Sequence, residues 1–195
     1  MITALELEPG EVVTEAYLIQ RLGCGRTPLR EALQRLAHEH LLVINPRRGA
    51  TVANLGIKEF GQLLETLLGV EAFAIRYAAE RITERELARL EEITARGEEA
   101  AASGDYATWA ELDYQLHTTI AAASQNRFTV ECLGPLYRQV ARFAYLGVSR
   151  PGAARAASGD HSQIVAALRA RDPDRCERLF RQHVENARER IRAAL

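Results

Sequence analysis

The sequence has few cysteines and no long apolar run. Its three cysteines, Cys24, Cys132 and Cys176, are odd in number and far apart, which excludes a disulfide framework and a zinc ribbon. No stretch approaches ~18 residues without a charge, so a membrane-spanning helix is not expected. The first residues, MITALELEPGE, carry acids where a signal peptide carries a basic region. We therefore expect a soluble, cytoplasmic protein.

The chain also lacks an excess of either charge, with a formal net charge of -1. The charges are nevertheless segregated. Between positions 21 and 48, six arginines face only Glu31 and Glu39, a local formal charge of +4. These arginines are Arg21, Arg26, Arg30, Arg35, Arg47 and Arg48. A basic segment in an otherwise acidic chain suggests a nucleic-acid partner for that segment.

The first 55 residues contain the signals of two short helices and a hairpin. Apolar spacing predicts helices over 11–22 and 26–40, separated by a glycine-containing break, with Pro28 in the first turn of the second. Two β-prone runs, LLVIN and ATVANL, flank Pro46-Arg47-Arg48-Gly49 and predict a two-stranded hairpin. Helix, glycine turn, arginine-rich helix and hairpin follow one another in the order of a winged helix-turn-helix.

From about residue 57 onward the strand signals disappear and helix caps take their place. Thr83-x-x-Glu86 has capping-box spacing, Asp105 follows a Ser-Gly break, and Asp172 precedes a first-turn proline. The predicted helices span 57–81, 84–102, 106–123, 127–147, 152–170 and 173–193. Short connections between six helices favour an antiparallel bundle. The predicted fold is therefore mainly α, with a DNA-binding domain over 1–55 and an all-helical domain over 56–195.

The start of the second helix carries the side chains suited to a DNA groove. Arginine can pair bidentately with guanine, so Arg26 and Arg30 are candidate base readers, while Thr27 is suited to phosphate. Arg47, Arg48 and Gly49, at the hairpin tip, are candidates for the minor groove. Any one of these arginines alone would equally suit a solvated helix face. Their clustering in a winged-helix order favours DNA binding.

Three histidines beyond the first domain fall on apolar helix faces. Asp113 and His117 lie four residues apart on one face, and His161 and His183 occupy similar faces of two other helices. Singly, each histidine would be a core residue. Together, three imidazoles and one carboxylate in a bundle interior suit a divalent metal, with zinc expected first and nickel, manganese, iron or cobalt as alternatives.

The N-terminal segment resembles the winged helix-turn-helix of GntR-type regulators. The resemblance rests on Leu-x-Pro-Gly-Glu, Leu-Gly-x-x-Arg-Thr-Pro-Leu-Arg-Glu-Ala-Leu and Pro-Arg-Arg-Gly, within about positions 5–52. It implies a homodimer that binds a double-stranded operator of two-fold symmetry, with contacts from Arg26, Thr27, Arg30 and Gly49. The family's further helix before the first motif has only MITA in its place, which implies a domain lacking part of its first helix.

The remainder, about 57–193, resembles the FCD effector domain of the FadR branch of that family. Asp-x-x-Leu-His-x-x-Ile, Asp-His-x-x-Ile-x-x-Ala-Leu and Arg-Asp-x-x-x-Cys-x-x-x-Phe-x-x-His carry the match. The resemblance implies metal ligation by Asp113, His117, His161 and His183. A metal with open positions favours a small organic acid as effector.

Further residues are candidates for the effector itself. Arg138 and Arg142, one turn apart, could pair with the acid, although a solvated or salt-bridged stripe explains them slightly better. Asn126 matches an asparagine near the family's pocket, and Leu67 stands where many relatives carry an arginine.

These patterns predict a ligand-responsive transcription regulator and not an enzyme. Two alternatives stay open. Three histidines and a carboxylate with an open position could activate water in a metal-dependent hydrolase. The metal could also be purely structural and brace the bundle.

Overall fold

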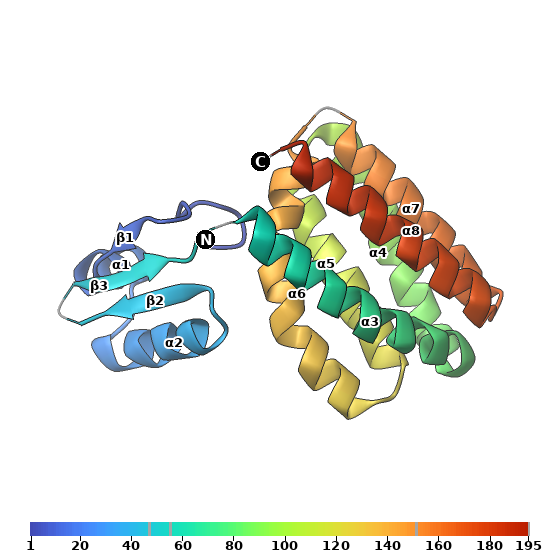
Figure 1. The fold of residues 1–195 in the computed structure, drawn as a ribbon, viewed down its shortest axis with the longest axis horizontal. Helices are drawn as coiled ribbons and strands as arrows, with labels where there is room; N and C mark the ends of the chain where they lie inside the picture. The colour runs from blue at the N-terminus through green and yellow to red at the C-terminus, as the bar shows by residue number, and fades with distance from the viewer. Residues whose placement is uncertain (47, 55, 151, 195) are drawn as a thin grey trace. The chain divides into compact units, whose positions relative to one another are not determined.

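The computed structural model describes residues 1–46, 48–54, 56–150 and 152–194. The chain divides into two compact units, Met1–Gly56 and Ile57–Leu195, and each is described by itself. Figure 1 shows a small unit with a sheet and two helices, and a larger unit made of helices. The predicted fold class, mainly α with a winged helix-turn-helix and a helical bundle, is confirmed.

The first unit packs two helices against a three-stranded antiparallel sheet (Figure 1). The helices are α1 (Glu15–Leu22) and α2 (Arg26–His38), and the strands are β1 (Val12–Val13), β2 (Leu42–Asn45) and β3 (Gly49–Val52). The strand order is β1-β3-β2, with Val13 opposite Ala50 and Ile44 opposite Ala50 on its other side. A cluster of buried side chains among the described residues forms the core: Leu7, Val13, Leu18, Leu29, Leu33, Leu42, Ala50 and Val52.

The start of the first helix differs from the sequence-based prediction. The prediction began the helix at Glu11 and contained a two-stranded hairpin only, whereas Val12 and Val13 form a third strand against β3. The helix begins after Thr14, whose Oγ1 accepts a hydrogen bond from Tyr17 N at 3.2 Å. The prediction was wrong here because a two-residue strand is too short to have a periodicity of its own.

The second helix begins as predicted and ends earlier than predicted. Gly25 is the N-cap and supplies no side-chain hydrogen bond, which agrees with the absence of a serine or threonine there. The helix ends at His38 and not at His40, because His40 has a φ of 58° in the left-handed region that a helix cannot contain.

The second unit is a bundle of six helices. They are α3 (Ile57–Arg81), α4 (Glu84–Ser103), α5 (Tyr106–Ala123), α6 (Arg127–Val148), α7 (Ala153–Arg169) and α8 (Pro173–Arg192). Every end lies within one residue of its predicted position. The predicted caps explain this agreement: Thr83 and Glu86 form the capping box, and the side chains of Asp105 and Asp172 accept from the first turns of α5 and α8.

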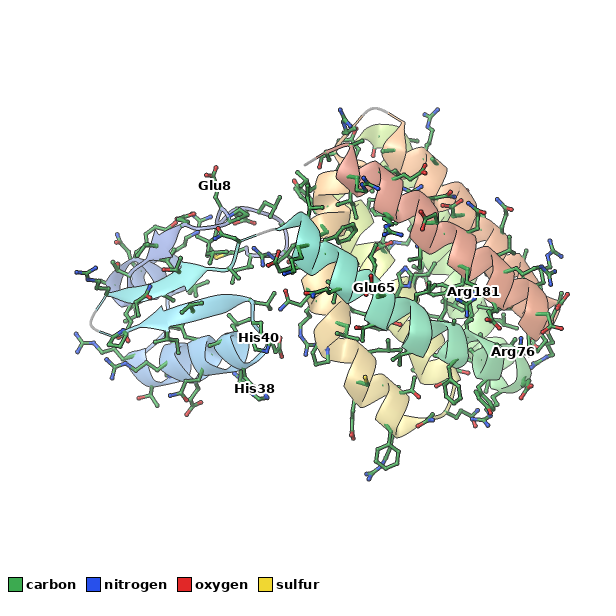
Figure 2. The ribbon with its side chains drawn as sticks, in the orientation of Figure 1. Glu8, His38, His40, Glu65, Arg76 and Arg181 are labelled. Carbon is green, nitrogen blue, oxygen red and sulfur yellow. The ribbon has the colours of Figure 1, made fainter. Side chains whose placement is uncertain are left out.

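Helices distant in sequence hold the bundle together. Arg76 on α3 reaches α8, where its Nη1 lies 2.6 Å from Asp174 and 3.0 Å from Glu177 (Figure 2). Gly147 on α6 allows close packing on α8, since a Cβ at this position would lie 2.6 Å from Ile191 Cγ1.

The three cysteines are free thiols, and Cys176 is buried, which raises its pKa to about 12. None of the described helices has the length and apolar character to cross a membrane.

Candidate functional site

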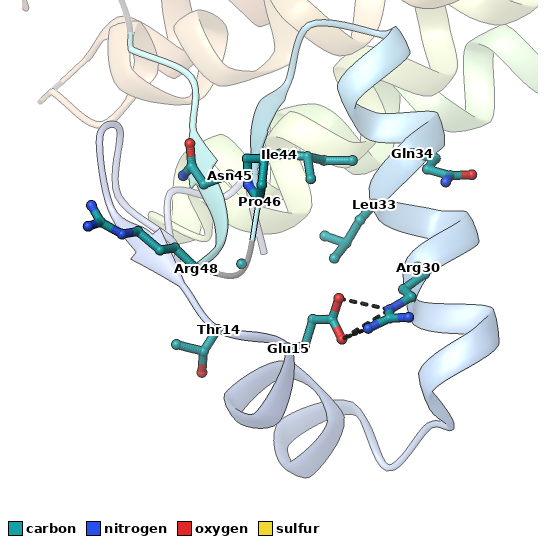
Figure 3. Close-up of a pocket in the computed structure, with 10 residues that line it drawn as sticks. Thr14, Glu15, Arg30, Leu33, Gln34, Ile44, Asn45, Pro46 and Arg48 are labelled. Atoms are coloured by element: carbon teal, nitrogen blue, oxygen red, sulfur yellow. Dashed lines mark hydrogen bonds and ion pairs between the residues drawn. The ribbon is translucent and has the colours of Figure 1, made fainter.

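The candidate DNA-binding side chains lie at the surface of the first unit. Arg26, Thr27 and Arg30 are exposed on the first two turns of α2, and Arg48 is exposed in the β2–β3 hairpin. Arg47 lies outside the described residues. Arg30, Leu33 and Gln34 of α2 and the β2–β3 hairpin border a groove of about 610 Å³, with Arg30 and Arg48 on opposite sides (Figure 3).

Arg30 has an intramolecular partner on α1. Its Nε and Nη2 lie 2.9 to 3.1 Å from the carboxylate oxygens of Glu15, in a two-pronged ion pair (Figure 3). The hydrogen bond from Arg30 lowers the pKa of Glu15, and the same bond raises the pKa of Arg30. To contact a base, Arg30 would therefore have to share its hydrogen bonds with Glu15 or leave that partner. Arg26 differs, because no carboxylate of the described residues lies within 4.0 Å of its guanidinium.

Gly49 has a structural reason to be glycine. Its φ is 98°, and a Cβ at this position would lie 2.1 Å from Val13 O and 2.9 Å from Thr14 Cα. The close approach of β1 to β3 therefore requires glycine, independently of any contact with DNA.

The bundle interior brings together the three histidines predicted from the sequence. His117 on α5, His161 on α7 and His183 on α8 are all buried, and each offers a ligand atom within 4.8 Å of the other two. Asp113, one turn before His117, contributes Oδ1 at 3.3 Å from His161 Nε2 and 3.7 Å from His117 Nε2. These four side chains are called the histidine cluster below.

Glu71 on α3 orients one imidazole of the histidine cluster. Its side chain is fully buried, and Oε1 lies 2.6 Å from His117 Nδ1. A carboxylate at this distance holds a proton on Nδ1 and leaves Nε2 directed toward Asp113 and the other histidines. The contact therefore presets His117 as an Nε2 ligand.

Asp160 has the corresponding place beside His183. Its Oδ2 lies 3.5 Å from His183 Nδ1, and both carboxylate oxygens accept from Asn186 Nδ2, at 3.1 and 3.2 Å. His183 Nε2 is thus left for the interior of the cluster. His161 Nε2 and His183 Nδ1 are buried and make no hydrogen bond of good geometry with the described residues.

Burial and mutual charge shift the pKa values of the histidine cluster in opposite directions. Burial alone would lower the pKa of His117, but the Glu71 carboxylate and Asp113 raise it to about 9. Burial and the neighbouring imidazoles lower the pKa of His183 to about 4, against the contact with Asp160. Burial would raise the pKa of Asp113, but contact with His161 and the nearby imidazoles holds it at about 2.

These shifts predict a stability optimum near pH 6.5 for the metal-free bundle. The raised pKa of His117 contributes stability below about 6.5 that is lost as pH rises toward 9. The lowered pKa of His183 contributes stability above about 6.5 that is lost as pH falls toward 4. On each side of this optimum, the free energy of unfolding should fall by about 1.4 kcal/mol per pH unit.

Urea unfolding with a chelator at pH 5, 6.5 and 8, followed by the fluorescence of Trp109, measures this optimum. Trp109 is the only tryptophan in the chain and lies in the bundle. His183→Gln should remove the loss of stability at acid pH and leave the loss at alkaline pH unchanged. Equal stability of the parent protein at all three pH values would contradict the assigned shifts.

Sequence reasoning did not identify Glu71 or Tyr137 as part of the site. Tyr137 on α6 is buried, with its ring centroid 5.7 Å from that of His117. A signal for Glu71 was present, because it is the one charged residue in the otherwise apolar run LLGVEAFAI. Tyr137 carried no comparable signal, since tyrosine is common on helix faces.

The predicted effector residues do not line the cavity next to the histidine cluster. A cavity of about 50 Å³ adjoins Asp113, His117 and His183, and its lining includes none of Asn126, Arg138 and Arg142. Asn126 is the N-cap of α6, with Oδ1 accepting from the amides of Phe128 and Thr129. Arg138 folds back toward Gly134 on its own helix. Effector binding by these three residues stays a prediction.

The histidine cluster fits a divalent metal. Imidazole nitrogens with one carboxylate oxygen are the donors of zinc and of several first-row metals. Carboxylates behind two of the imidazoles match the outer ligand shell that usually orients such histidines. Burying Asp113 among three imidazoles without an ion or proton to compensate its charge would be costly.

The fold and the two sites define a class of protein: a winged helix-turn-helix joined to a helical bundle with a buried histidine cluster. The GntR family of bacterial regulatory proteins matches residues 1–52, and the FCD domain matches residues 62–186. The chain belongs to the GntR family and carries an FCD domain.

Individual relatives extend along nearly the whole chain. The chain is 26% identical to the HTH-type transcriptional repressor RspR of Escherichia coli K12, over 95% of this chain and 82% of that protein. It is 29% identical to the Nta operon transcriptional regulator of Aminobacter aminovorans, over 95% and 86%. The solved structure of E. coli McbR/YncC superposes with a TM-score of 0.84 at 23% identity, over 94% of this chain and 88% of that one.

These matches identify the chain as a transcriptional regulator with a helix-turn-helix domain and an FCD effector domain. The domains and relatives are regulators and not enzymes, so the alternative of a metal-dependent hydrolase is dropped. FCD domains can bind metals, and this one contains the buried histidine triad described above.

Proposed function

We propose that the protein is a cytoplasmic homodimer that binds an operator of two-fold symmetry and changes its affinity for that operator when the bundle binds a small carboxylate. In this proposal a divalent metal, zinc first, is held by Asp113, His117, His161 and His183. The observation that carries it is the convergence of three buried imidazoles from three helices beside a buried carboxylate. The metal would supply a Lewis-acidic centre with an open position for a carboxylate oxygen.

Metal analysis of the purified protein tests the ligand set. We expect about one divalent ion per chain, lost in Asp113→Ala and His161→Ala because each removes a donor. Glu111→Ala, an exposed carboxylate two residues before Asp113, and His40→Ala, an exposed histidine of the first unit (Figure 2), are matched controls that should keep the ion. A parent protein without metal, and unable to take up zinc, would overturn the ligand proposal.

For DNA we propose contacts from Arg26, Thr27, Arg30, Arg48 and Gly49, with Arg47 at the hairpin tip. Support comes from the exposure of Arg26, Thr27, Arg30 and Arg48 and from the groove that Arg30 and Arg48 line in the first unit. Phosphate contacts by several arginines predict binding that weakens steeply with salt.

Arg26→Ala should relax the preference at one base position by about 1–3 kcal/mol, because a base-reading arginine discriminates by roughly that amount. Binding measured by fluorescence anisotropy, against operators varied one position at a time, gives the change. Arg96→Ala, on the exposed face of the bundle helix α4, is the control with no expected effect. Uniform weakening on all sequences would instead identify Arg26 as a phosphate contact.

A purely structural metal is the second candidate, and the small volume of the adjoining cavity favours it. The two candidates differ in one measurement. If carboxylates shift operator affinity in the metal-loaded protein, the metal belongs to a sensor; if chelation alone destabilises the bundle and no acid alters DNA binding, the metal is structural.

A further inference from the structure

A carboxylate lies among the candidate DNA-binding side chains of the first unit. Glu15 lines the same groove as Arg30 and Arg48, and it pairs with Arg30 (Figure 3). The charge of Arg26 also acts on this carboxylate, since it helps to lower the pKa of Glu15. A negative charge at a surface that meets phosphates weakens DNA binding in general, so any benefit of Glu15 must come through the arginines beside it.

The stability of the first unit gains little from this ion pair. The side chain of Arg30 is 63% exposed and that of Glu15 is 33% exposed, so water and salt screen their attraction. The N-cap hydrogen bond of α1 comes from Thr14 and not from Glu15. The pair is therefore better suited to controlling one guanidinium than to holding the fold.

The ion pair engages only one edge of the guanidinium. Nε of Arg30 lies 2.9 and 3.1 Å from the two Glu15 oxygens, and Nη2 lies 3.0 Å from Oε2. The Nη1–Nη2 edge carries two parallel N–H groups that Glu15 does not engage. Two parallel N–H groups of an arginine suit O6 and N7 of guanine in the major groove. Arg30 can therefore divide its donors between Glu15 and a base.

Holding Arg30 in place also lowers the cost of reading a base. A long exposed side chain loses rotamer freedom when it binds, and a side chain that is already held loses less. Glu15 is the first residue of α1, directly after the segment whose backbone packs closely on Gly49. The carboxylate therefore holds the guanidinium from a closely packed part of the unit.

We propose that Glu15 determines DNA-sequence specificity by positioning Arg30. It presents the Nη1–Nη2 edge of the guanidinium to a guanine, and its negative charge keeps a phosphate from taking the same place. The inference rests on the proposed contact between Arg30 and a base, and Glu15 acts through Arg30 without touching the base itself. Glu15 thus raises the ratio of specific to non-specific affinity.

Glu15→Gln removes the charge and keeps the length of the side chain. The specific probe is the duplex that the parent chain selects most strongly from a random-sequence library, and the non-specific probe is a scrambled duplex of equal composition. We expect the affinity for the scrambled duplex to rise about two- to fivefold and the ratio of the two affinities to fall at least about fivefold, because Arg30 is freed to bind phosphate. On the scrambled duplex, the slope of log K against log salt should steepen by about 0.9, the value for one added phosphate contact.

Glu6→Gln is the matched control. Glu6 pairs with Arg21 at 3.1 Å, and both side chains are about half exposed, so the substitution removes the same charge from the same unit. Arg21 is not among the proposed DNA contacts, so the affinity ratio should stay the same. A purely structural role of Glu15 would weaken binding to both duplexes alike. An unchanged ratio in Glu15→Gln, or an equal fall in Glu6→Gln, would overturn the inference.

A base analogue tests the effect at a single guanine. Replacing the guanines of the selected duplex one at a time by 7-deazaguanine removes N7, one acceptor of the bidentate pair. At one position the parent chain should lose about five- to tenfold in affinity, whereas Glu15→Gln should lose only about twofold there. Equal losses in the two proteins at every position would contradict the positioning of Arg30.

Arg30→Ala separates this inference from the proposed function. If Arg30→Ala keeps the sequence preference of the parent at every position, Arg30 reads no base and both proposals are wrong. If Arg30→Ala loses the preference at one guanine and Glu15→Gln keeps it, the base contact stands and this inference alone is wrong. In the double variant, Glu15→Gln should change the preference at that guanine no further, because Glu15 acts through Arg30.

Discussion

Glu71→Ala is expected to destabilise the bundle by about 3–5 kcal/mol. The substitution removes a fully buried carboxylate whose Oε1 lies 2.6 Å from His117 Nδ1, and it leaves that imidazole N–H buried without its partner. Breaking one side of a buried, hydrogen-bonded pair costs about this much. Because the carboxylate also presets His117 as an Nε2 ligand, the affinity for zinc should fall about 10–100-fold.

Urea unfolding followed by Trp109 fluorescence measures the loss of stability, and zinc titration measures the affinity. Glu71→Gln should cost less, since the amide oxygen still accepts from Nδ1–H. Glu65→Ala, on the exposed face of the same helix (Figure 2), is the control and should change stability by less than about 0.5 kcal/mol. If Glu71→Ala and Glu65→Ala behave alike, the proposed role of Glu71 is wrong.

Gly49→Ala is expected to destabilise the winged helix by about 3 kcal/mol or more. A Cβ would lie 2.1 Å from Val13 O, which is a backbone atom, so β1 and β3 would have to separate. The φ of 98° adds a cost that any L side chain incurs. Separation of the strands would also disturb the start of α1 at Thr14.

Gly23→Ala isolates the steric part of this effect. Gly23 has a positive φ of 61° in the same unit, but a Cβ there would meet nothing within 4 Å. Its substitution should cost only about 1–2 kcal/mol, the price of the left-handed conformation. Hydrogen exchange of the β3 amides reports the first unit directly, because the single tryptophan lies in the bundle. Equal protection in both variants would contradict the clash.

Much of the bundle was predictable because its signals are local. The capping box at Thr83 and the capping aspartates act within one helical turn, and they position the starts of α4, α5 and α8. The helical period likewise places Asp113 and His117 on one inward face. Periodicity could not predict β1, since its two residues are strand only through pairing with Thr51 and Ala50.

The contacts around the predicted sites join residues that are far apart in the sequence. Glu71 and His117 are 46 residues apart, and Arg190 meets Asp160 across 30 residues. The pairing of Arg30 with Glu15 joins two helices across a turn. No local pattern predicts such contacts, because they depend on how the helices pack and on which rotamers that packing allows.

The sequence by itself therefore determined the fold class, the boundaries of the bundle helices and the inward faces of the three histidines, since caps and periodicity act over a few residues. Only the tertiary structure decided which carboxylate orients each imidazole, which carboxylate pairs with Arg30 and why position 49 is glycine. The physical reason is that these features depend on distances between atoms that the chain brings together only when its helices and strands pack.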